Sequence, residues 1–368
     1  MKVIWPTKSA TSTRKTKAFV GLSGGVDSAV SAALLKKEGF DVTGVFIRIS
    51  LEGYLCTAGE DRIDAMRAAA HLRIPFQEID LSDAYKRTVF DLSIREFEAG
   101  RTPNPDALCN REIKFGLFFD HCIEQGADLV ATSHYAQTKD ELLYAGADQD
   151  KDQSYFLWAV PQEKLRRTVF PVGGYKKQKV RALAERFGLP NAARKDSQGL
   201  CFLGPISMDD MLHRELALAP GAVLDLRGKI IGAHEGAAAY TLGQRHGFAL
   251  SANSPDARPH FVVAKDVAAN TITVSAERYP QGVTTTELEL AQCNWIGEAE
   301  DGEAMVRYRY RQQLIPATLR RTAQGASVVL KEPHFAPEGQ SLVLYRKERC
   351  LGGGVILSAR YGDTHRKS

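Results

Sequence analysis

The segment that most constrains the fold of this chain is Gly21-Leu22-Ser23-Gly24-Gly25-Val26-Asp27-Ser28. A short apolar run at residues 18–20 precedes it, and a helix-like run at residues 29–35 follows it. A strand, a tight Gly/Ser turn and a helix N-terminus together form an anion site, because backbone N–H groups converge there and the helix dipole favours negative charge. The segment therefore predicts a phosphate-binding loop between a strand and a helix.

This loop is not a Walker A motif, because the closing Lys-Ser/Thr pair is missing. The pattern Ser-Gly-Gly-x-Asp-Ser instead resembles the pyrophosphate loop (PP-loop) of enzymes that split ATP into AMP and pyrophosphate. The alternative is an ordinary glycine-rich turn that caps a helix. We favour the pyrophosphate loop, because all eight residues stand together at a strand–helix junction.

Length and composition are typical of a globular protein with two or three domains: 368 residues, 44% hydrophobic and 25% charged. No apolar run approaches the roughly 18 residues of a membrane span, and the N-terminus lacks the apolar core of a signal peptide. We therefore expect a cytoplasmic protein without membrane contact. The six cysteines include no C-x-x-C pair, so we do not expect a zinc ribbon, and we assign no metal-binding residues.

The charge of the chain is unevenly distributed. Residues 1–17 carry five basic residues and no acidic ones, which leaves −1 of the net +4 for the rest. We expect this segment to be a disordered basic tail. Nucleic-acid affinity would then depend on local patches. One lies between Lys164 and Lys195 and another between Arg307 and Arg321, and either could instead be a solvated face.

Strand-like and helix-like segments alternate in the first half of the chain. The predicted strands are 17–22, 42–49, 76–81 and 128–132, and the predicted helices are 28–38, 61–72, 84–98 and 112–125. This alternation predicts a parallel sheet covered on both faces, with a ligand crevice at the carboxyl ends of the strands.

The second half of the chain reads differently. Helices are predicted at 177–187 and 208–216, and strands at 222–226, 229–231, 261–263 and 271–274. From about residue 283 only strands and turns are predicted, including 304–312, 315–320, 327–330 and 341–345. We expect a small barrel or sandwich there. The predicted boundaries are a tail at 1–17, a catalytic domain at 18–207, a central domain at 208–280 and a C-terminal β domain at 281–368.

Residues 100–111 read Gly-Arg-Thr-Pro-Asn-Pro-Asp-Ala-Leu-Cys-Asn-Arg. Two prolines in three residues predict a stiff, irregular loop, which presents Asp106 and Cys109 just before a helix that starts near Glu112. A thiol near a helix N-terminus and beside Arg111 is expected to have a lowered pKa. The alternative is a structural cysteine behind a rigid loop.

A second cysteine changes this balance. The segment Asp196-Ser-Gln-Gly-Leu-Cys201 is another polar turn that presents a thiol, and only folding could bring it to Cys109. One pyrophosphate loop and two loop-borne thiols suggest ATP-driven sulfur chemistry. ATP would activate an oxygen as a leaving group, and sulfur would displace it.

On these segments the chain closely resembles the tRNA-specific 2-thiouridylases of bacteria. The resemblance extends over nearly everything after the tail. It continues in Ala-Thr-Ser-His-Tyr at 131–135, Lys-Asp-Gln-Ser-Tyr-Phe-Leu at 151–157, Thr-Leu-Gly-Gln-Arg at 241–245, Arg-Tyr-Arg-Gln at 309–312 and Cys-Leu-Gly-Gly-Gly at 350–354. The chain departs from the family at Ser133, where Gly is common, and at Gln198, where Thr is usual.

The resemblance implies an adenine-nucleotide α-hydrolase-like N-terminal domain with a parallel sheet, a small central domain and a C-terminal β-barrel. The enzyme would adenylate the C2 oxygen of the wobble uridine of certain tRNAs, using ATP with Mg²⁺. Cys201 would carry a persulfide supplied by a sulfur-relay protein or cysteine desulfurase. Cys109 would be the nucleophile that releases the sulfur, and Asp106 the general acid/base. The resemblance also implies a monomer.

The resemblance further implies two sets of binding residues. Those expected to bind ATP are Gly21, Leu22, Ser23, Gly24, Gly25, Val26, Asp27, Ser28, Ile47 and Ser133. Those expected to contact tRNA are Asn104, Pro105 and Asp106 at the flipped base, together with His134, Lys151, Asp152, Gln153, Arg309, Tyr310 and Gln340. In the strand-like segment 307–311, alternation would place three arginines on one face and two tyrosines on the other.

Three alternatives stay open from the sequence. Another adenylating enzyme, such as an ammonia-using synthetase, would share the loop but would need no paired thiols. A tRNA-binding module that has lost catalysis would not need the reactive groups. An iron–sulfur-dependent thiolase could take three ligands from the two cysteines and Asp106. The sequence does not name the sulfur donor or the tRNAs.

Overall fold

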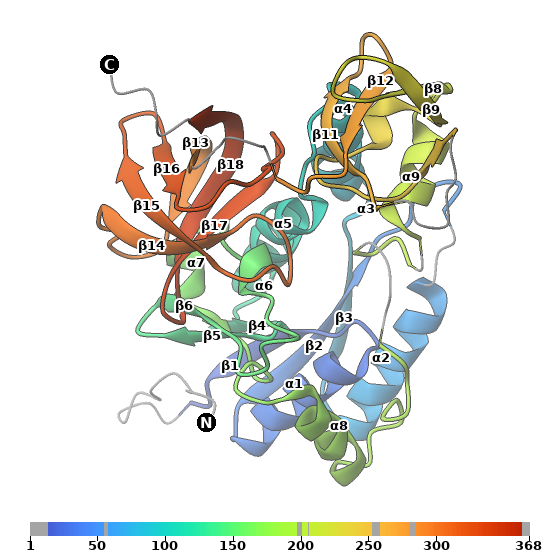
Figure 1. The fold of residues 1–368 in the computed structure, drawn as a ribbon. Coiled ribbons are helices and arrows are strands. Elements are labelled where there is room, and N and C mark those ends of the chain that lie inside the picture. The colour runs from blue at the N-terminus through green and yellow to red at the C-terminus, as the bar shows by residue number, and fades with distance from the viewer. Residues whose placement is uncertain are drawn as a thin grey trace.

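Three regions, each with its own β-sheet, make up the protein (Figure 1). The computed structural model describes residues 14–54, 58–196, 201–204, 206–251, 258–279 and 285–362. In Figure 1 the N-terminal α/β region is at the bottom, the C-terminal barrel at the upper left and the small central region at the upper right. The expected order of an α/β region, a small central region and a β-barrel is confirmed.

The N-terminal sheet is parallel throughout, as predicted, with the strand order β3-β2-β1-β4-β7. Its strands are β1 Lys17–Gly21, β2 Asp41–Arg48, β3 Phe76–Asp80, β4 Leu129–Ala131 and β7 Thr168–Val169. Helices cover both faces of this sheet. Successive side chains of a strand point to opposite sides, so each strand contributes to the core on either face. In β1, Ala18 and Val20 enter the core on one face, whereas Phe19 enters the core on the other.

The helices divide between these two faces. The core that contains Ala18 and Val20 includes side chains from α1 Val26–Lys37 and α2 Ala58–Leu72, and α8 Lys177–Arg186 packs on α1. The core around Phe19 takes side chains from two longer helical stretches. The first is α3 Ser82–Tyr85, η1 Lys86–Phe90 and α4 Asp91–Glu98, and the second is α5 Pro105–Cys109, η2 Asn110–Leu117 and α6 Phe118–Glu124. Both η1 and η2 are π-helical turns.

The central region is a mostly antiparallel sheet with the order β10-β9-β8-β12-β11. Its elements are α9 Met208–Glu215, β8 Gly221–Leu224, β9 Ile230–His234, η4 Ala237–Ala239, β10 Phe248–Leu250, β11 Phe261–Asp266 and β12 Thr271–Ser275. A capping box between Ser207 and Asp210 starts α9, since each side chain accepts the other's backbone N–H. The central region has a core of its own, which includes Val223, Val262 and Ile272.

The C-terminal strands close into a barrel, because β13 pairs with β18 as well as with β16. The strands are β13 Thr285–Trp295, β14 Gly302–Arg307, β15 Ile315–Arg321, β16 Ala326–Leu330, β17 Ser341–Arg346 and β18 Arg349–Gly362. A hairpin of β5 Ala136–Lys139 and β6 Leu142–Ala145 extends this sheet, because β6 pairs with β18. This hairpin comes from the N-terminal half of the chain and was not predicted.

The strand predicted at 304–312 is too long. β14 ends at Arg307, and Arg311 has a φ of 60°. The side-chain oxygen of Gln312 accepts from the backbone N–H groups of Tyr308 and Arg309, at 3.0 and 3.1 Å, so the chain turns there instead of pairing with a strand. The predicted alternation of arginines and tyrosines on two strand faces is therefore wrong.

Most of the predicted basic tail, residues 1–13, lies outside the described residues. Of the remainder, Arg14 pairs with Asp128 at 2.7 Å, and Lys17 is the first residue of β1. Within the part of the chain that the structure describes, no helix has both the length and the apolar character needed to cross a bilayer.

Candidate active site

The phosphate-binding loop lies where β1 leads into α1, at the carboxyl edge of the parallel sheet (Figure 1). Gly24 has a φ of 77°, and a Cβ there would lie 2.4 Å from the Asp61 carbonyl oxygen, so a larger residue does not fit. The Ser28 hydroxyl accepts from the Ser23 N–H at 3.1 Å and donates to the Gly25 carbonyl at 3.0 Å. These bonds hold the turn against the N-terminus of α1, where an anion is favoured.

Charged side chains gather beside this loop. The Lys177 ammonium lies 2.8 Å from the carboxylates of both Asp27 and Asp196. Lys151 and Arg181 also donate to Asp196, at 3.1 and 2.5 Å. Burial alone would raise the pKa of Asp196, but the hydrogen bonds from Lys177 and Lys151 lower that pKa to about 2. Lys177 therefore connects Asp196, at the start of the predicted thiol turn, with Asp27 of the phosphate-binding loop.

Ile47 and Ser133, also expected at the ATP site, lie at the same edge of the sheet. Ile47 is near the end of β2, and Ser133 follows the end of β4. Both are partly exposed, and β1 lies between their strands. The ten residues expected to bind ATP therefore share one edge of the sheet, although their contact with a nucleotide stays a prediction.

The thiols of Cys109 and Cys201 face each other, with their Sγ atoms 3.4 Å apart. Cys109 is buried at the end of α5, and Cys201 is half-buried in a turn. Both thiols are free, since an S–S bond would bring the sulfurs to about 2.05 Å. The fold thus brings together two thiols that stand 92 positions apart in the chain.

The irregular loop predicted over residues 100–111 is only partly correct: residues 101–104 have no regular structure, but the chain is helical from Pro105 onward. α5 begins at Pro105, and the Asn104 side-chain oxygen caps it by accepting from the Ala107 N–H at 3.1 Å. Proline is tolerated at the first helical position, because its missing N–H would have no partner in the helix anyway. Asp106 and Cys109 consequently lie three residues apart on one side of a helix.

The two thiols differ in protonation, and the lowered pKa predicted for Cys109 is wrong. Burial and the hydrogen bond to Cys201 raise the pKa of Cys109 well above its ordinary value. Cys109 lies inside a helical run from Pro105 to Glu124, so no free helix N-terminus lies beside it. The hydrogen bond from Cys109 lowers the pKa of Cys201, with help from the charge of Lys114 and against the effect of burial. The pair therefore favours a thiolate on Cys201.

Asp106 lies against the same pair. Burial raises the pKa of its carboxyl, whereas the charge of Lys114 and the backbone N–H of Cys201 act in the opposite direction. A carboxyl with a raised pKa binds a proton more tightly than an ordinary one, which suits a group that accepts a proton and later returns it. The site thus combines a thiolate, a thiol and a proton carrier.

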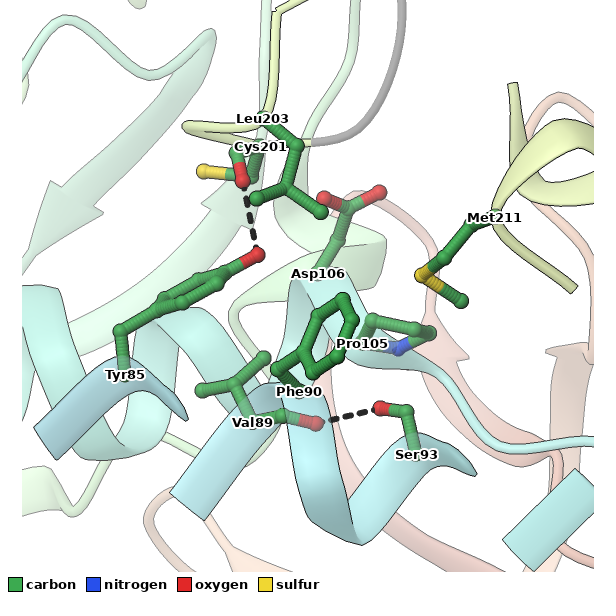
Figure 2. A pocket seen from close by; sticks show the side chains of 9 residues that line it. All are labelled: Tyr85, Val89, Phe90, Ser93, Pro105, Asp106, Cys201, Leu203 and Met211. Atoms are coloured by element: carbon green, nitrogen blue, oxygen red, sulfur yellow. Dashed lines mark hydrogen bonds between the residues drawn. The ribbon is translucent and has the colours of Figure 1, made fainter. Parts of the chain in front are cut away.

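Figure 2 shows the pocket that Asp106 and Cys201 share. The Tyr85 hydroxyl donates to the Cys201 carbonyl at 2.9 Å and holds the turn in place. The lining side chains are Tyr85, Val89, Phe90, Ser93, Pro105, Asp106, Cys201, Leu203 and Met211. Its free volume is about 10 Å³, room for roughly one water molecule, so a nucleobase would require the walls to move apart. Met211 belongs to α9, so the central region supplies part of the wall.

Most residues expected to contact tRNA are partly exposed. They are Asn104, Pro105, Asp106, Lys151, Gln153, Arg309, Tyr310 and Gln340. Tyr155 connects several of them: its hydroxyl donates to the Tyr308 carbonyl at 2.8 Å and to the Gln340 side chain at 3.1 Å. The Tyr310 ring packs on the Phe156 ring, with centroids 4.7 Å apart. Tyr308, Tyr310 and Gln340, from the C-terminal region, therefore lie against η3 Ser154–Phe156.

Two of the expected tRNA contacts, His134 and Asp152, are buried. His134 Nδ1 lies 2.8 Å from the Thr132 hydroxyl, and burial lowers the pKa of His134 well below its usual value, so its ring is neutral. Asp152 accepts from the backbone N–H groups of Gly146 and Ser154 at 2.9 and 3.0 Å and pairs with Arg307. In this structure both side chains are enclosed by protein.

The Asp152–Arg307 pair predicts a large effect on stability. Arg307 is buried and also donates to the Tyr345 hydroxyl at 2.7 Å. Asp152→Ala should lower the free energy of unfolding by about 3–5 kcal/mol, because it leaves a buried guanidinium without its anion. Urea unfolding followed by tyrosine and tryptophan fluorescence measures the change. Arg311→Met, at an exposed position nearby, is the control and should change stability by less than about 0.5 kcal/mol. Unchanged stability of Asp152→Ala would contradict the structural role.

Three site residues were missed from the sequence. Lys114 acts on both thiols and Asp106, Lys177 bridges Asp27 and Asp196, and Tyr85 holds the Cys201 backbone. Lys114 stands three residues after the segment 100–111, but a regular α-helix would not align it with Cys109, five residues earlier. Lys177 belongs to the basic patch at 164–195, yet nothing in that patch distinguishes it from its neighbours.

Among the described residues, no group of three or more His, Cys, Asp or Glu side chains is placed to hold a metal ion.

Comparison with protein families gives three consecutive matches. Residues 16–205 match the tRNA methyl transferase HUP domain, residues 209–276 the tRNA methyl transferase PRC-barrel domain, and residues 285–356 the aminomethyltransferase beta-barrel domain. The first match alone covers more than half of the chain.

Curated relatives match over nearly the full length. The tRNA-specific 2-thiouridylase MnmA of Burkholderia pseudomallei is 42% identical over 365 residues, 95% of each chain. The protein of the same name from Nitrosomonas eutropha is 40% identical over 356 residues, 93% of this chain and 98% of its own. A solved 4-thiouridine synthetase–RNA complex with bound ATP is 18% identical and covers 52% of this chain and 46% of that one, with a TM-score of 0.34. That likeness is too low to support an argument.

Proposed function

Since this chain belongs to the tRNA-specific 2-thiouridylase family, we propose that it uses ATP to replace the C2 oxygen of the wobble uridine of tRNA by sulfur. The observation that carries the proposal is the 3.4 Å approach of the Cys109 and Cys201 sulfurs, with Asp106 beside them. Two thiols at this distance are suited to taking up one sulfur atom and releasing it. This favours thiolation over the methyl transfer that the family descriptions name.

ATP would bind at the carboxyl edge of the parallel sheet. Its phosphates would meet the loop at residues 21–28 and the N-terminus of α1. The Lys177 ammonium, which pairs with both Asp27 and Asp196, lies within reach of phosphates on that loop. Mg²⁺ would enter on the ATP phosphates and neutralise part of their charge.

The first chemical step is adenylation of the base. The uracil O2 attacks the α-phosphorus of ATP, an O2–P bond forms, and pyrophosphate leaves with the electron pair of the broken P–O bond. The N3 proton of the base passes to the Asp106 carboxylate. The raised pKa of Asp106 supports this role, because a stronger base takes that proton more readily.

The second step transfers sulfur. The outer sulfur of a Cys201 persulfide attacks C2, and AMP leaves with the former O2. Asp106 returns its proton to N3 and then takes the proton of the Cys109 thiol. The Cys109 sulfur attacks Cys201 Sγ, so that the persulfide S–S bond breaks and a Cys109–Cys201 disulfide forms. The released sulfur stays on C2, and Asp106 gives its proton to solvent. A thiol reductant restores the two thiols. The sulfurs would have to approach by only about 1.4 Å to bond.

The partners follow from this chemistry. A sulfur-relay protein or a cysteine desulfurase would supply the persulfide sulfur. The tRNA would lie across the start of α5 and the surface formed by Arg309, Tyr310 and Gln340, and one monomer would contain the complete site. The base enters the closed pocket only if it leaves the anticodon stack and the pocket opens.

The direct test is reconstitution. Purified protein with ATP, Mg²⁺, unmodified tRNA and a sulfide source should yield 2-thiouridine, detected by mass spectrometry of digested nucleosides, with one pyrophosphate released per base modified. The control omits ATP and should yield none. Pyrophosphate release without 2-thiouridine would contradict the proposal and favour another adenylating enzyme.

A further inference from the structure

Lys114 stands on η2, the π-helical turn that directly follows Cys109. The i→i+5 bonding of a π-turn brings residues five apart toward the same side of the helix, which an α-helix does not do. The Phe118 N–H bonds to the Ile113 carbonyl in this way at the end of η2. The turn therefore carries Lys114 to the side of the helix on which Cys109 faces Cys201. Such turns occur frequently at functional sites.

The Lys114 ammonium lies inside this site. It sits 5.6 Å from the centre of the Phe202 ring, the residue next to Cys201, and its charge acts on Cys201, Cys109 and Asp106. Neighbouring Arg111 pairs with Glu112, whereas Lys114 has no carboxylate ion pair among the described residues. Lys114 is half-buried, and a charge that folding partly removes from water is stabilised by a nearby anion.

The ionisable groups around Lys114 respond differently to their surroundings. From α5, burial raises the pKa of Asp106 and, together with the hydrogen bond to Cys201, the pKa of Cys109. From α3, burial raises the pKa of the Tyr85 phenol, and from the segment after β4, His134 is neutral. Cys201, whose sulfur lies 3.4 Å from that of Cys109, is the acidic group here whose pKa is lowered, by the hydrogen bond from Cys109 and by the charge of Lys114.

We propose that Lys114 is the charge partner that keeps Cys201 as a thiolate, ready to accept sulfur from the donor; the inference rests on the proposed function. The Cys201 thiolate attacks the outer sulfur of a donor persulfide. A Cys201 Sγ–S bond forms, the S–S bond of the donor breaks, and the donor sulfur leaves as a thiolate with the bonding electrons. Lys114 keeps its proton throughout and attracts the attacking sulfur.

Alkylation of Cys201 by iodoacetamide tests this without tRNA, ATP or a sulfur donor. Trypsin should release Cys201 in the peptide 196–214 and Cys109 in the peptide 102–111, each with a single cysteine, so mass spectrometry follows each thiol separately. In Lys114→Met, the alkylation rate of Cys201 at pH 7 should fall at least about tenfold, because the reactive thiolate becomes scarcer. Its pH midpoint should rise by about one unit or more.

Two variants control the experiment. Lys114→Arg keeps the charge and should retain a Cys201 pH midpoint within about half a unit of the original. Lys164→Met removes another lysine that lies over a ring, 5.2 Å from the centre of Phe119, and should leave the midpoint unchanged. A wild-type pH profile for Lys114→Met would overturn the inference. If Lys114→Met fails to fold, Lys114→Gln is measured in its place. A raised pH midpoint of Cys201 alkylation in that variant supports the inference, and an unchanged midpoint overturns it. If the wild-type protein forms no 2-thiouridine in the reconstitution, the proposed function is wrong, whereas the role of Lys114 in the pKa of Cys201 is still decided by the alkylation experiment.

Discussion

Replacing Cys201 by serine is expected to abolish 2-thiouridine formation, to below about one thousandth of the original rate, while ATP-dependent pyrophosphate release persists. Serine cannot carry a persulfide, and its hydroxyl is a much weaker nucleophile than the thiolate favoured at Cys201. The loop at residues 21–28 is untouched by the change. Single-turnover reactions with tRNA and a persulfide donor, analysed for both products, measure the two steps separately.

Cys293→Ser is the matched control for this experiment. Cys293 is a half-buried free thiol in β13 of the barrel, outside the pocket of Figure 2. It should modify tRNA at nearly the original rate. If Cys201→Ser also forms 2-thiouridine normally, the persulfide does not reside on Cys201, and the mechanism proposed for the thiol pair is wrong.

Replacing Asp106 by asparagine should lower the rate of modification by about 10²- to 10⁴-fold, the usual range for a lost general acid/base. Asparagine has nearly the same shape, and its oxygen can still accept the Cys201 backbone N–H. The original protein should lose activity as the pH falls through the raised pKa of Asp106, because the base becomes protonated. This acidic limb should disappear from the residual activity of the variant.

The stability of the same variant provides an independent readout. A carboxyl whose pKa is raised by folding binds its proton more tightly in the folded state, so its contribution to stability is greatest at low pH and is lost as the pH rises. Asparagine has no charge to bury. Asp106→Asn should therefore unfold at a temperature equal to or above that of the original protein at pH 8. A clear loss of stability at pH 8, together with an unchanged pH profile of activity, would show that Asp106 has only a structural role.

The sequence was most informative where a local rule determines the structure. Alternation of strands and helices predicted the parallel sheet, and the Ser-Gly-Gly-x-Asp-Ser pattern placed the anion loop on β1 and α1. The two thiols were identified as a possible pair, but their distance depends on how the Cys201 turn packs on α5. That packing involves Tyr85, which no motif connects with either cysteine.

The errors came from rules that depend on position within an element. Two prolines were read as a loop, whereas Pro105 occupies the first position of a helix. The pKa of Cys109 was expected to be lowered, but burial and the hydrogen bond to Cys201 raise it. Arg307 looked like one of several exposed arginines, but long-range pairing with Asp152 buries it. The alignment of Lys114 with the thiols requires a π-helical turn, which no sequence period indicates.

The β5–β6 hairpin determines which parts of this protein can move against each other. Its chain leaves the parallel sheet at β4, pairs with β18 of the barrel through Leu143 and Tyr144, and returns to β7. Strand pairing thus joins the barrel to the hairpin, and the hairpin is continuous with the parallel sheet that carries the phosphate-binding loop, so the barrel and the sheet should move as one body. The central region shares no strand with either sheet in the described residues, yet α9 supplies Met211 to the pocket wall. A displacement of the central region would therefore move one wall of the pocket without disturbing the distance between the barrel and the parallel sheet.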